Sequence, residues 1–357
     1  MNTPLDNYIG CLLGGAVGDA LGAPTEFLKL PTIMSRFGPN GVVDYVEFED
    51  GKGEITDDTQ MLLFTAEGLL RSSNRAATRG IDGAYPTICF QSYQRWLHTQ
   101  SDWHSEHTKG SRLLNGWLIN EKALYKRRAP GQTCLSALRS GTPGSVHHPI
   151  NNSKGCGGVM RIAPVGLVFQ NPEIAFTVGT ELAALTHGHP SGYLSSGVMA
   201  SIISLINTDH SLMEAITRSL SILKSQKYFE ETETAVKRAL ELHQQGKPSF
   251  HKIASLGEGW IAEEALSIAL YCALSHPDDF EKAIVMAINH NGDTDSTGAI
   301  TGNIVGLMLG EMGIPMRWLI NLKDIGIVRQ VAQDLYTEKH RKPDDANFEW
   351  NDRYPPC

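Results

Sequence analysis

Apolar residues recur along most of the chain at three- and four-residue spacing, which is the period of an amphipathic helix. The clearest example is the segment 57–71, where two aspartates precede apolar positions that fall on one helix face. The same period predicts further helices at about 172–187, 191–207, 211–224, 228–245, 257–275, 278–290, 295–311 and 325–338. The pattern therefore predicts an all-α fold.

Other segments interrupt this period. Residues 41–48, GVVDYVEF, are rich in β-branched and aromatic side chains and predict a short strand or hairpin arm. Long loops are expected at 23–56, 126–160 and 245–258, and long ordered loops tend to carry function. Because no repeat of fixed length occurs, we expect one compact many-helix domain over 1–357.

The first helical segment carries glycine at every fourth position, at Gly10, Gly14, Gly18 and Gly22. Residues four apart share one helix face, and each glycine costs about 1 kcal/mol of helix propensity relative to alanine. We interpret this face as a surface for close packing against another backbone. The same helix would deliver Asp19 and Glu26 to a crowded centre.

The balance of acidic and basic residues limits the classes of molecule that this protein is expected to bind. The chain holds 39 acidic and 31 basic residues, for a net charge of -8, which argues against nucleic-acid binding. The short basic run at 126–128 is typical of a solvated loop. No apolar stretch is long enough for a membrane span, no secretory signal is evident, and the scattered cysteines read as reduced thiols. We therefore expect a cytoplasmic protein without membrane partners.

Two acidic clusters, GEITDDTQM at 53–61 and NGDTDSTGAI at 291–300, each lie just before an apolar helix. Each could simply cap its helix, since Asp, Ser and Thr accept hydrogen bonds from free N–H groups. A cap needs only one side chain, whereas each cluster offers several adjacent oxygen donors, which suit hard cations such as Mg²⁺. We favour two halves of one metal site, meeting across a helical bundle.

Two other interpretations of Asp293–Ser296 fit less well. A calcium-binding EF-hand loop that starts at Asp293 would need glutamate where Ile304 stands. A phosphotransferase aspartate should follow a buried strand, but the apolar positions at 280, 283, 284 and 287 predict a preceding helix.

Three further stretches are candidates for ligand contacts. The glycine-rich segment 153–164, SKGCGGVMRIAP, leads into a helix expected to begin near Val159 and would suit phosphate or diphosphate, or serve as a connector. The segment 185–192, LTHGHPSG, places two histidines at an expected helix end, where they would meet the last carbonyls or a ligand. Trp260 would pack in the core or stack on a purine. No zinc-binding HExxH motif occurs.

Taken together, these motifs resemble the ADP-ribosylglycohydrolase family, which includes ADP-ribosylarginine hydrolases and dinitrogenase-reductase-activating glycohydrolase. The resemblance extends over nearly the whole chain, and its specificity comes from six motifs in the family order. They are GCLLGGAVGDALGAPTEF (10–27), GEITDDTQM (53–61), GCGGVMRIAP (155–164), LTHGHPSG (185–192), GEGWIAEEAL (257–266) and NGDTDSTGAITGNIVG (291–306).

The resemblance implies a compact all-α fold around a binuclear magnesium centre, sometimes occupied by manganese. It implies the metal ligands Thr56, Asp57, Asp58, Asp293, Asp295 and Ser296. It also implies that Glu26 lies at the metal edge and touches substrate or metal, and that Asp57, Asp58 or Glu26 handles protons. The implied substrate cleft comprises Ser153, Lys154, Gly155, Cys156, Gly157, Met160 and His187.

The sequence departs from the family pattern at two positions. Ser296 replaces the usual threonine and keeps the hydroxyl, whereas Cys156 replaces a common asparagine and puts one substrate hydrogen bond in doubt. The region 72–150 is where family members differ.

The resemblance implies a metal-dependent hydrolase that removes ADP-ribose from protein arginine and so reverses a regulatory or toxin-installed modification. Alternative substrates are serine-linked ADP-ribose and ADP-ribose esters. An alternative of another class is an immunity protein that occludes an ADP-ribosyltransferase toxin.

Overall fold

The structure is a computed structural model, and it describes residues 3–47, 51–100, 113–340 and 348–356. Within these ranges the chain forms 17 α-helices and no named strand, which confirms the all-α fold. The α-helices are α1 (Pro4–Gly22), α2 (Leu30–Phe37), α3 (Asp57–Arg79), α4 (Tyr85–Thr99), α5 (Gln132–Arg139), α6 (Ala163–Val168), α7 (Pro172–Ala184), α8 (Pro190–Ile206), α9 (Leu212–Leu223), α10 (Glu230–Gln244), α11 (Phe250–Ala254), α12 (Ala262–Ser275), α13 (Phe280–Ala287), α14 (Thr294–Leu309), α15 (Met316–Asn321), α16 (Ile325–His340) and α17 (Phe348–Arg353). The 3₁₀ helices are η1 (Ala23–Thr25), η2 (Leu118–Asn120), η3 (Lys122–Tyr125), η4 (Cys156–Gly158) and η5 (Glu311–Gly313).

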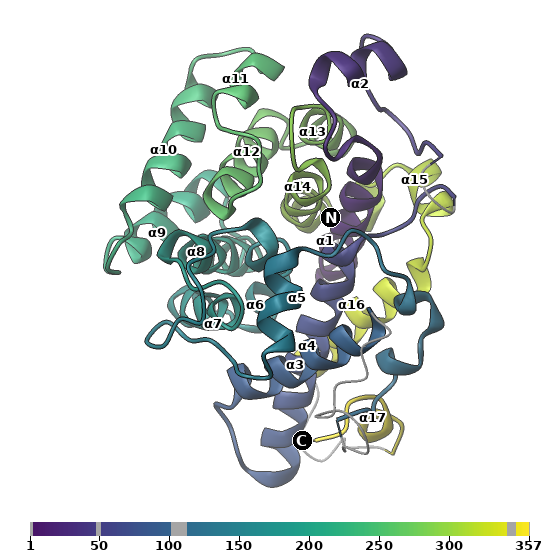
Figure 1. Ribbon diagram of the computed structural model, residues 1–357, viewed down its shortest axis with the longest axis vertical. Helices are drawn as coiled ribbons and strands as arrows, with labels where there is room; N and C mark the ends of the chain where they lie inside the picture. Colours follow the sequence, from purple (N-terminus) through teal and green to yellow (C-terminus); the bar gives the residue numbers. More distant parts are fainter. Residues whose placement is uncertain (1–2, 48–50, 101–112, 341–347, 357) are drawn as a thin grey trace.

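Helices α1 and α14 lie side by side at the centre of the bundle (Figure 1). The glycine face predicted for α1 packs directly on the backbone of α14. A Cβ atom added at Gly18 would overlap the carbonyl oxygen of Gly298, and one added at Gly14 would overlap that of Gly302. This antiparallel pairing brings the C-terminal end of α1 beside the N-terminal end of α14.

The other helices surround this pair. Helix α3 continues eight residues beyond the segment expected from periodicity and ends at Gly80, whose left-handed φ of 67° terminates it. Helices α7 and α8 pack together, and α10 packs on α12 (Figure 1). One large apolar cluster includes side chains from α1, α3, α4, α7, α8, α12, α14 and α16. No helix of the described residues is both long and apolar enough to cross a membrane.

The strand expected at 41–48 is not formed over 41–47, and residue 48 lies outside the described ranges. The backbone at Val42 instead pairs with a side-chain amide. Val42 N donates to Asn289 Oδ1 at 2.7 Å, and Asn289 Nδ2 donates to Val42 O at 2.9 Å. The amide of Asn289 thus satisfies the backbone groups that a neighbouring strand would otherwise pair.

Several expected helix boundaries were also wrong. The helix predicted to begin near Val159 begins at Ala163, because the glycines of the preceding 3₁₀ turn weaken helix formation and Pro164 suits a helix start. Helix α7 ends at Ala184, so the two histidines of LTHGHPSG do not lie in its last turn. His189 instead caps α8, its Nδ1 accepting from Ser191 N at 3.2 Å.

The expected loops contain short helices. Helix α2 lies within 23–56, α5 within 126–160 and α11 within 245–258. The helix predicted from residue 257 begins only at Ala262, and the residues before it form a loop that faces α14. These loop segments supply much of the wall of the cavity described next.

Candidate active site

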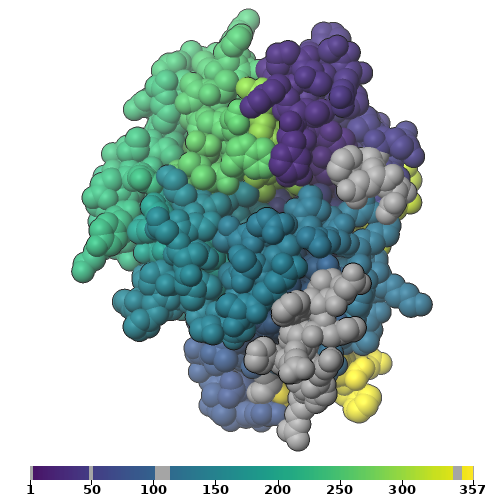
Figure 2. Space-filling view, in the orientation of Figure 1, coloured from purple at the N-terminus to yellow at the C-terminus, as the bar shows by residue number. Residues whose placement is uncertain are grey.

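A cavity of about 620 Å³ opens where the ends of several helices meet. The N-terminal ends of α3 and α14 face it, together with the chain that leaves α1 and the η4 turn. Figure 2 shows the purple N-terminal, teal central and green segments meeting on one face of the molecule. The lining residues are Glu26, Phe27, Asp57, Asp58, Arg127, Ala129, Pro130, Gly131, Gln132, Thr133, Cys134, Gly155, Cys156, Gly157, Met160, His187, Trp260, Asp293, Asp295 and Ser296.

The first acidic cluster forms the start of α3. Thr56 is the N-cap residue, and its Oγ1 accepts a hydrogen bond from Asp58 N at 3.3 Å. This extended N-cap backbone turns Asp57 and Asp58 toward the cavity, where both side chains are buried. Thr56 itself is buried behind the cavity wall.

The second cluster forms the start of α14 in the same way. Asp293 Oδ1 accepts from Ser296 N at 3.3 Å and so caps the helix. Asp295 Oδ1 also accepts from Ser296 N, at 3.0 Å. The capping interpretation is therefore confirmed for Asp293, and it leaves the second oxygen of each carboxylate for other contacts.

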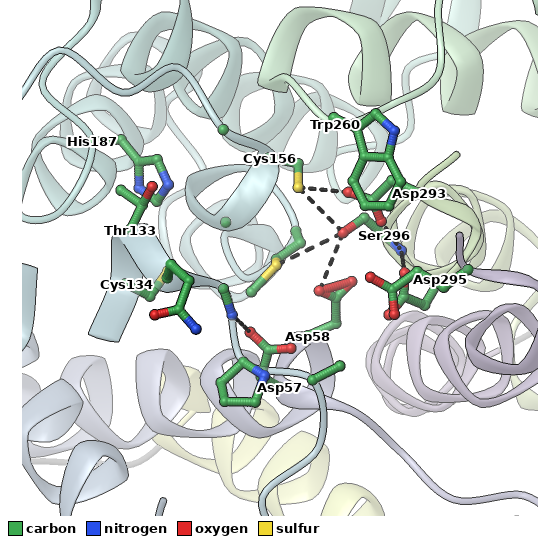
Figure 3. Close-up of a pocket in the computed structure, with 18 of the residues that line it drawn as sticks. Asp57, Asp58, Thr133, Cys134, Cys156, His187, Trp260, Asp293, Asp295 and Ser296 are labelled. Atoms are coloured by element: carbon green, nitrogen blue, oxygen red, sulfur yellow. Dashed lines mark hydrogen bonds between the residues drawn. The ribbon is translucent and has the colours of Figure 1, made fainter. Parts of the chain in front are cut away.

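The two clusters meet directly. Ser296 Oγ donates to Asp58 Oδ2 at 3.2 Å, which joins residues 238 positions apart in the chain (Figure 3). Figure 3 shows Asp58, Asp293, Asp295 and Ser296 gathered on one side of the cavity. The prediction that the clusters meet across the bundle is thus confirmed, and Glu26 lines the same cavity.

Asp19 organises the cluster from behind. It is fully buried on α1, and its carboxylate accepts from Thr56 N at 3.0 Å and from Thr59 Oγ1 at 2.5 Å. Burial raises the pKa of Asp19 to about 6, although the hydrogen bonds from Thr59 and Thr56 act in the opposite direction. Asp19 thus fixes the loop that carries Asp57 instead of lining the cavity.

The cluster gathers carboxyl groups that are almost completely buried. Burial, and then neighbouring carboxylates, raise the pKa values of Asp57, Asp58 and Asp295 well above their usual range; for Asp57, a hydrogen bond from Gly131 N acts in the opposite direction. Among the described residues, Asp58 Oδ1 has no hydrogen-bond partner at all. Buried carboxylates crowded in this way, with an unpartnered oxygen, suit a divalent cation bound through oxygen.

The acidic side chains of the two clusters do not by themselves form a complete set of metal ligands. Within the described residues, no three His, Cys, Asp or Glu side chains converge closely enough to hold an ion. The hydroxyl group of Ser296 lies beside the carboxylate of Asp58 and adds an oxygen atom. Thr56 Oγ1 instead accepts from Asp58 N at the start of α3, and Thr56 is not among the residues that line the cavity. The donor chemistry, oxygen without nitrogen, fits Mg²⁺ or Mn²⁺ better than zinc.

The expected substrate residues divide into two groups. Gly155, Cys156, Gly157, Met160 and His187 line the cavity. Ser153 and Lys154 are not among its lining residues. Lys154 Nζ instead contacts Glu263 Oε1 at 2.6 Å and Glu231 Oε2 at 3.0 Å, so its charge is directed at these glutamates.

Cys156 contacts the acidic cluster itself. Its Sγ donates to Asp293 Oδ2, with 2.7 Å between the two atoms, and accepts from Ser296 Oγ at 3.6 Å. Burial and then the charges of Asp293 and Asp58 raise the pKa of this thiol well above its usual range. Cys156 therefore meets the acidic cluster as a neutral thiol.

His187 lies on the side of the cavity opposite the acidic cluster (Figure 3). Its Nδ1 is 2.9 Å from Thr186 Oγ1, and its ring is buried. Burial, and then the nearby charge of Arg161, lower its pKa to about 3. At neutral pH His187 is therefore an uncharged hydrogen-bonding group.

Sequence reasoning named Trp260 as a candidate for ligand contacts but missed Phe27 and the segment 127–134. The rings of Phe27 and Trp260 stack at 5.0 Å between centroids, and Trp260 lines the cavity instead of lying in the core. The segment 127–134 forms another part, with Gly131 N donating to Asp57 Oδ2 at 3.2 Å. The Ala-Pro-Gly sequence at 129–131 signalled a turn there, but nothing in the local sequence indicated which cavity it faced.

Comparisons with known proteins agree with this geometry. The sequence profile of the ADP-ribosylglycohydrolase family matches residues 1–345, so the chain belongs to this family. It is therefore a hydrolase of the ADP-ribosylglycohydrolase type. A solved structure described as an ADP-ribosylglycohydrolase-related protein complex is similar at a TM-score of 0.64 and 25% identity, covering 94% of this chain and 99% of that one.

Three relatives illustrate the range of the family. ADP-ribosylarginine hydrolase Tri1 of Serratia proteamaculans is 24% identical, covering 93% of this chain and 79% of that protein. The ADP-ribosyl-dinitrogen reductase glycohydrolase of Rhodospirillum rubrum is 26% identical, covering 92% and 94%. ADP-ribosylhydrolase ARH3 of Mus musculus is 25% identical, covering 93% and 91%.

Proposed function

We propose that this protein hydrolyses the N-glycosidic bond between ADP-ribose and a protein arginine, in a reaction that depends on Mg²⁺. The observation that carries the proposal is the hydrogen bond of 3.2 Å from Ser296 Oγ to Asp58 Oδ2. It places two capped acidic helix ends against each other at the base of a cavity large enough for a nucleotide sugar.

The expected metal ligands are Thr56, Asp57, Asp58, Asp293, Asp295 and Ser296. When bound there, Mg²⁺ would lower the pKa of a coordinated water and hold the hydroxyl groups of the distal ribose. Manganese has the same preference for oxygen and would serve in its place.

The protein's own groups then have distinct tasks. Glu26, Asp57 and Asp58, three of the five acids that line the cavity, are the candidates to accept and return a proton. Gly155 and Gly157 bring unsubstituted backbone to the cavity wall, where a diphosphate can approach closely. His187, being neutral, can donate or accept a hydrogen bond without adding charge.

Two observations support arginine as the acceptor. Two of the relatives described above act, by their names, on ADP-ribosylarginine or on ADP-ribosylated dinitrogen reductase. In addition, Phe27 is 69% exposed and stacks on Trp260 beside Glu26. Flat aromatic faces near a carboxylate suit a planar guanidinium group better than a serine side chain.

The test is release of ADP-ribose from peptides modified on arginine or on serine, measured chromatographically with Mg²⁺ and with EDTA. We expect release from the arginine peptide with Mg²⁺ only, and its loss in Asp57→Ala and Asp58→Ala. Faster release from the serine peptide would overturn the arginine assignment. Full activity of both variants, or in EDTA, would overturn the metal-dependent mechanism.

A further inference from the structure

The lining of the cavity is electrostatically one-sided. Five carboxylates face it, from Glu26, Asp57, Asp58, Asp293 and Asp295. His187 adds no charge at neutral pH, because its pKa is lowered to about 3. Among the described residues that line the cavity, Arg127 is the only lysine or arginine. A dianionic diphosphate that entered this cavity would therefore have one cationic side chain to meet.

The loop that carries Arg127 is fixed by its two neighbours. Lys126 Nζ contacts Glu54 Oε1 at 3.3 Å, and an Arg128 guanidinium nitrogen contacts Glu54 Oε2 at 2.9 Å. Because alternate residues of an extended chain point to opposite sides, directing these two side chains at Glu54 turns the side chain between them the other way.

The backbone of the same loop is tied to the acidic cluster. Gln60 Nε2 donates to Lys126 O at 2.9 Å, and Asp57 N donates to Arg128 O at 3.2 Å. Ala129 then has a φ of 44°, unusual for a residue other than glycine, and the chain turns through Pro130 into α5. Arg127 is thus held at the rim of the cavity by contacts on both sides of it.

The guanidinium group of Arg127 is not committed elsewhere. No ion pair within the described ranges includes it, and its side chain is exposed at the cavity rim. The lysine that sequence reasoning placed in the substrate cleft, Lys154, is instead paired with Glu263 and Glu231. Of the three basic residues at 126–128, Lys126 and Arg128 hold the loop through Glu54, and Arg127 faces the cavity.

We propose that Arg127 binds the diphosphate of the ADP-ribose moiety and is a determinant of substrate affinity in this protein. The inference rests on the proposed function, since it concerns the same cavity. A planar guanidinium group can donate two parallel hydrogen bonds to phosphate oxygens, which a lysine cannot reproduce. It would also offset the repulsion between the diphosphate and the carboxylates of the cavity.

The test measures the dissociation constants of ADP-ribose and of adenosine by calorimetry in the presence of Mg²⁺. We expect Arg127→Ala to weaken ADP-ribose binding about tenfold at low salt and to leave adenosine binding unchanged. The loss should shrink at high salt, and Arg127→Lys should recover part of it. In turnover, the KM should rise while kcat changes little, because the reacting bond lies at the acidic cluster.

The matched control is Lys126→Ala, which removes the same charge from the adjacent residue but not from the cavity lining. It should leave ADP-ribose affinity near that of the wild type. Equal affinities of wild type and Arg127→Ala for ADP-ribose would overturn the role of Arg127 and leave the proposed function standing. Failure of the wild type to bind ADP-ribose at all would overturn the proposed function, and the role of Arg127 with it.

Discussion

At the scale of single residues, Asp58 is the point at which the two halves of the site touch. One of its oxygens accepts from Ser296, while the other has no hydrogen-bond partner among the described residues. Burial, and then the charges of Asp57, Asp19 and Asp293, raise its pKa well above the usual range. A buried carboxylate with an unpartnered oxygen and negatively charged neighbours favours a bound cation. Without a cation, it lowers the free energy of unfolding.

We therefore predict opposite effects of Asp58→Asn on stability and activity. Removing the charge should raise the free energy of unfolding by roughly 0.5–2 kcal/mol in EDTA, while ADP-ribose release falls by at least about 10²-fold. Urea unfolding and a chromatographic release assay measure the two effects. The control Asp278→Asn, at an exposed position outside the cavity, should change neither. A metal-free Asp58→Asn protein that is less stable than wild type would contradict the argument.

His187 leads to a prediction about pH. Its folded-state pKa of about 3 is below the ordinary value of 6.5, so in acid the unfolded chain binds a proton that the folded protein excludes. Above pH 6.5 His187 therefore does not lower the free energy of unfolding. As the pH falls from 6.5 toward 3, the free energy of unfolding decreases by up to about 1.4 kcal/mol per pH unit because of this residue.

In His187→Gln, the free energy of unfolding should therefore fall less steeply with acid than in wild type. Urea unfolding at several pH values between about 7 and 4.5 compares the two slopes. His251→Gln, at an exposed position on α11, should keep the wild-type slope. Identical slopes in all three proteins would show that His187 is protonated normally in the folded state.

At the scale of helices, the α1–α14 pair sets the geometry of the site. The glycines of α1 let its backbone lie on that of α14, so the residues after Gly22 lie beside the start of α14. Each acidic cluster begins a helix, and its aspartates occupy a helix N-terminus whose free N–H groups favour negative charge. The close packing of α1 and α14 therefore fixes the position of the segment after Gly22 relative to the second acidic cluster.

Substituting one glycine of this contact should be costly. We predict that Gly18→Ala lowers the free energy of unfolding by about 1–3 kcal/mol. The added methyl group at position 18 would overlap the carbonyl oxygen of Gly298. Gly326→Ala in α16 is the matched control: its new Cβ would meet no atom within 4 Å, so stability should stay equal or rise by up to about 1 kcal/mol. Thermal or urea unfolding of both variants measures the difference. Equal stabilities would mean that α1 and α14 can separate freely.

The elements also show where local sequence is informative. Periodicity identified the long helices, and acidic residues at 57–58 and 293–295 marked two helix starts correctly. The strand expected from the residue types at 41–47 does not form, because the amide of the distant Asn289 pairs with the backbone of Val42. The helix expected near Val159 begins later, because two glycines precede it. The histidines of LTHGHPSG were misplaced because Gly188 and Pro190 interrupt the helical period, and Pro190 then starts a new helix.

At the scale of the whole molecule, the cavity draws on segments from nearly the full length of the chain, from Glu26 to Ser296. Five carboxyl groups line the cavity, and the exposed Arg127 stands at its rim. If the proposed cation and diphosphate bind, this distribution would place the cation at the carboxyl groups and the diphosphate next to Arg127 at the rim.

The sequence by itself determined the local properties of this protein. Helical periodicity dictates the all-α fold, the spacing of Gly10, Gly14, Gly18 and Gly22 dictates a close-packing face, and the two acidic clusters dictate capped helix starts with surplus oxygens. Each of these follows from neighbours in the chain, because hydrogen-bond geometry and side-chain period act over a few residues.

Only the tertiary structure decided which of these local features act together. Ser296 and Asp58 are 238 residues apart. The like chemistry of the two clusters predicted that they meet, but only the packing of the helices brings these two side chains into contact. The turn of Lys154 away from the cavity and the approach of Arg127 to its rim depend on glutamates elsewhere in the fold, Glu263, Glu231 and Glu54. A site of this kind depends on the packing of distant helices, and packing is a property of the whole chain.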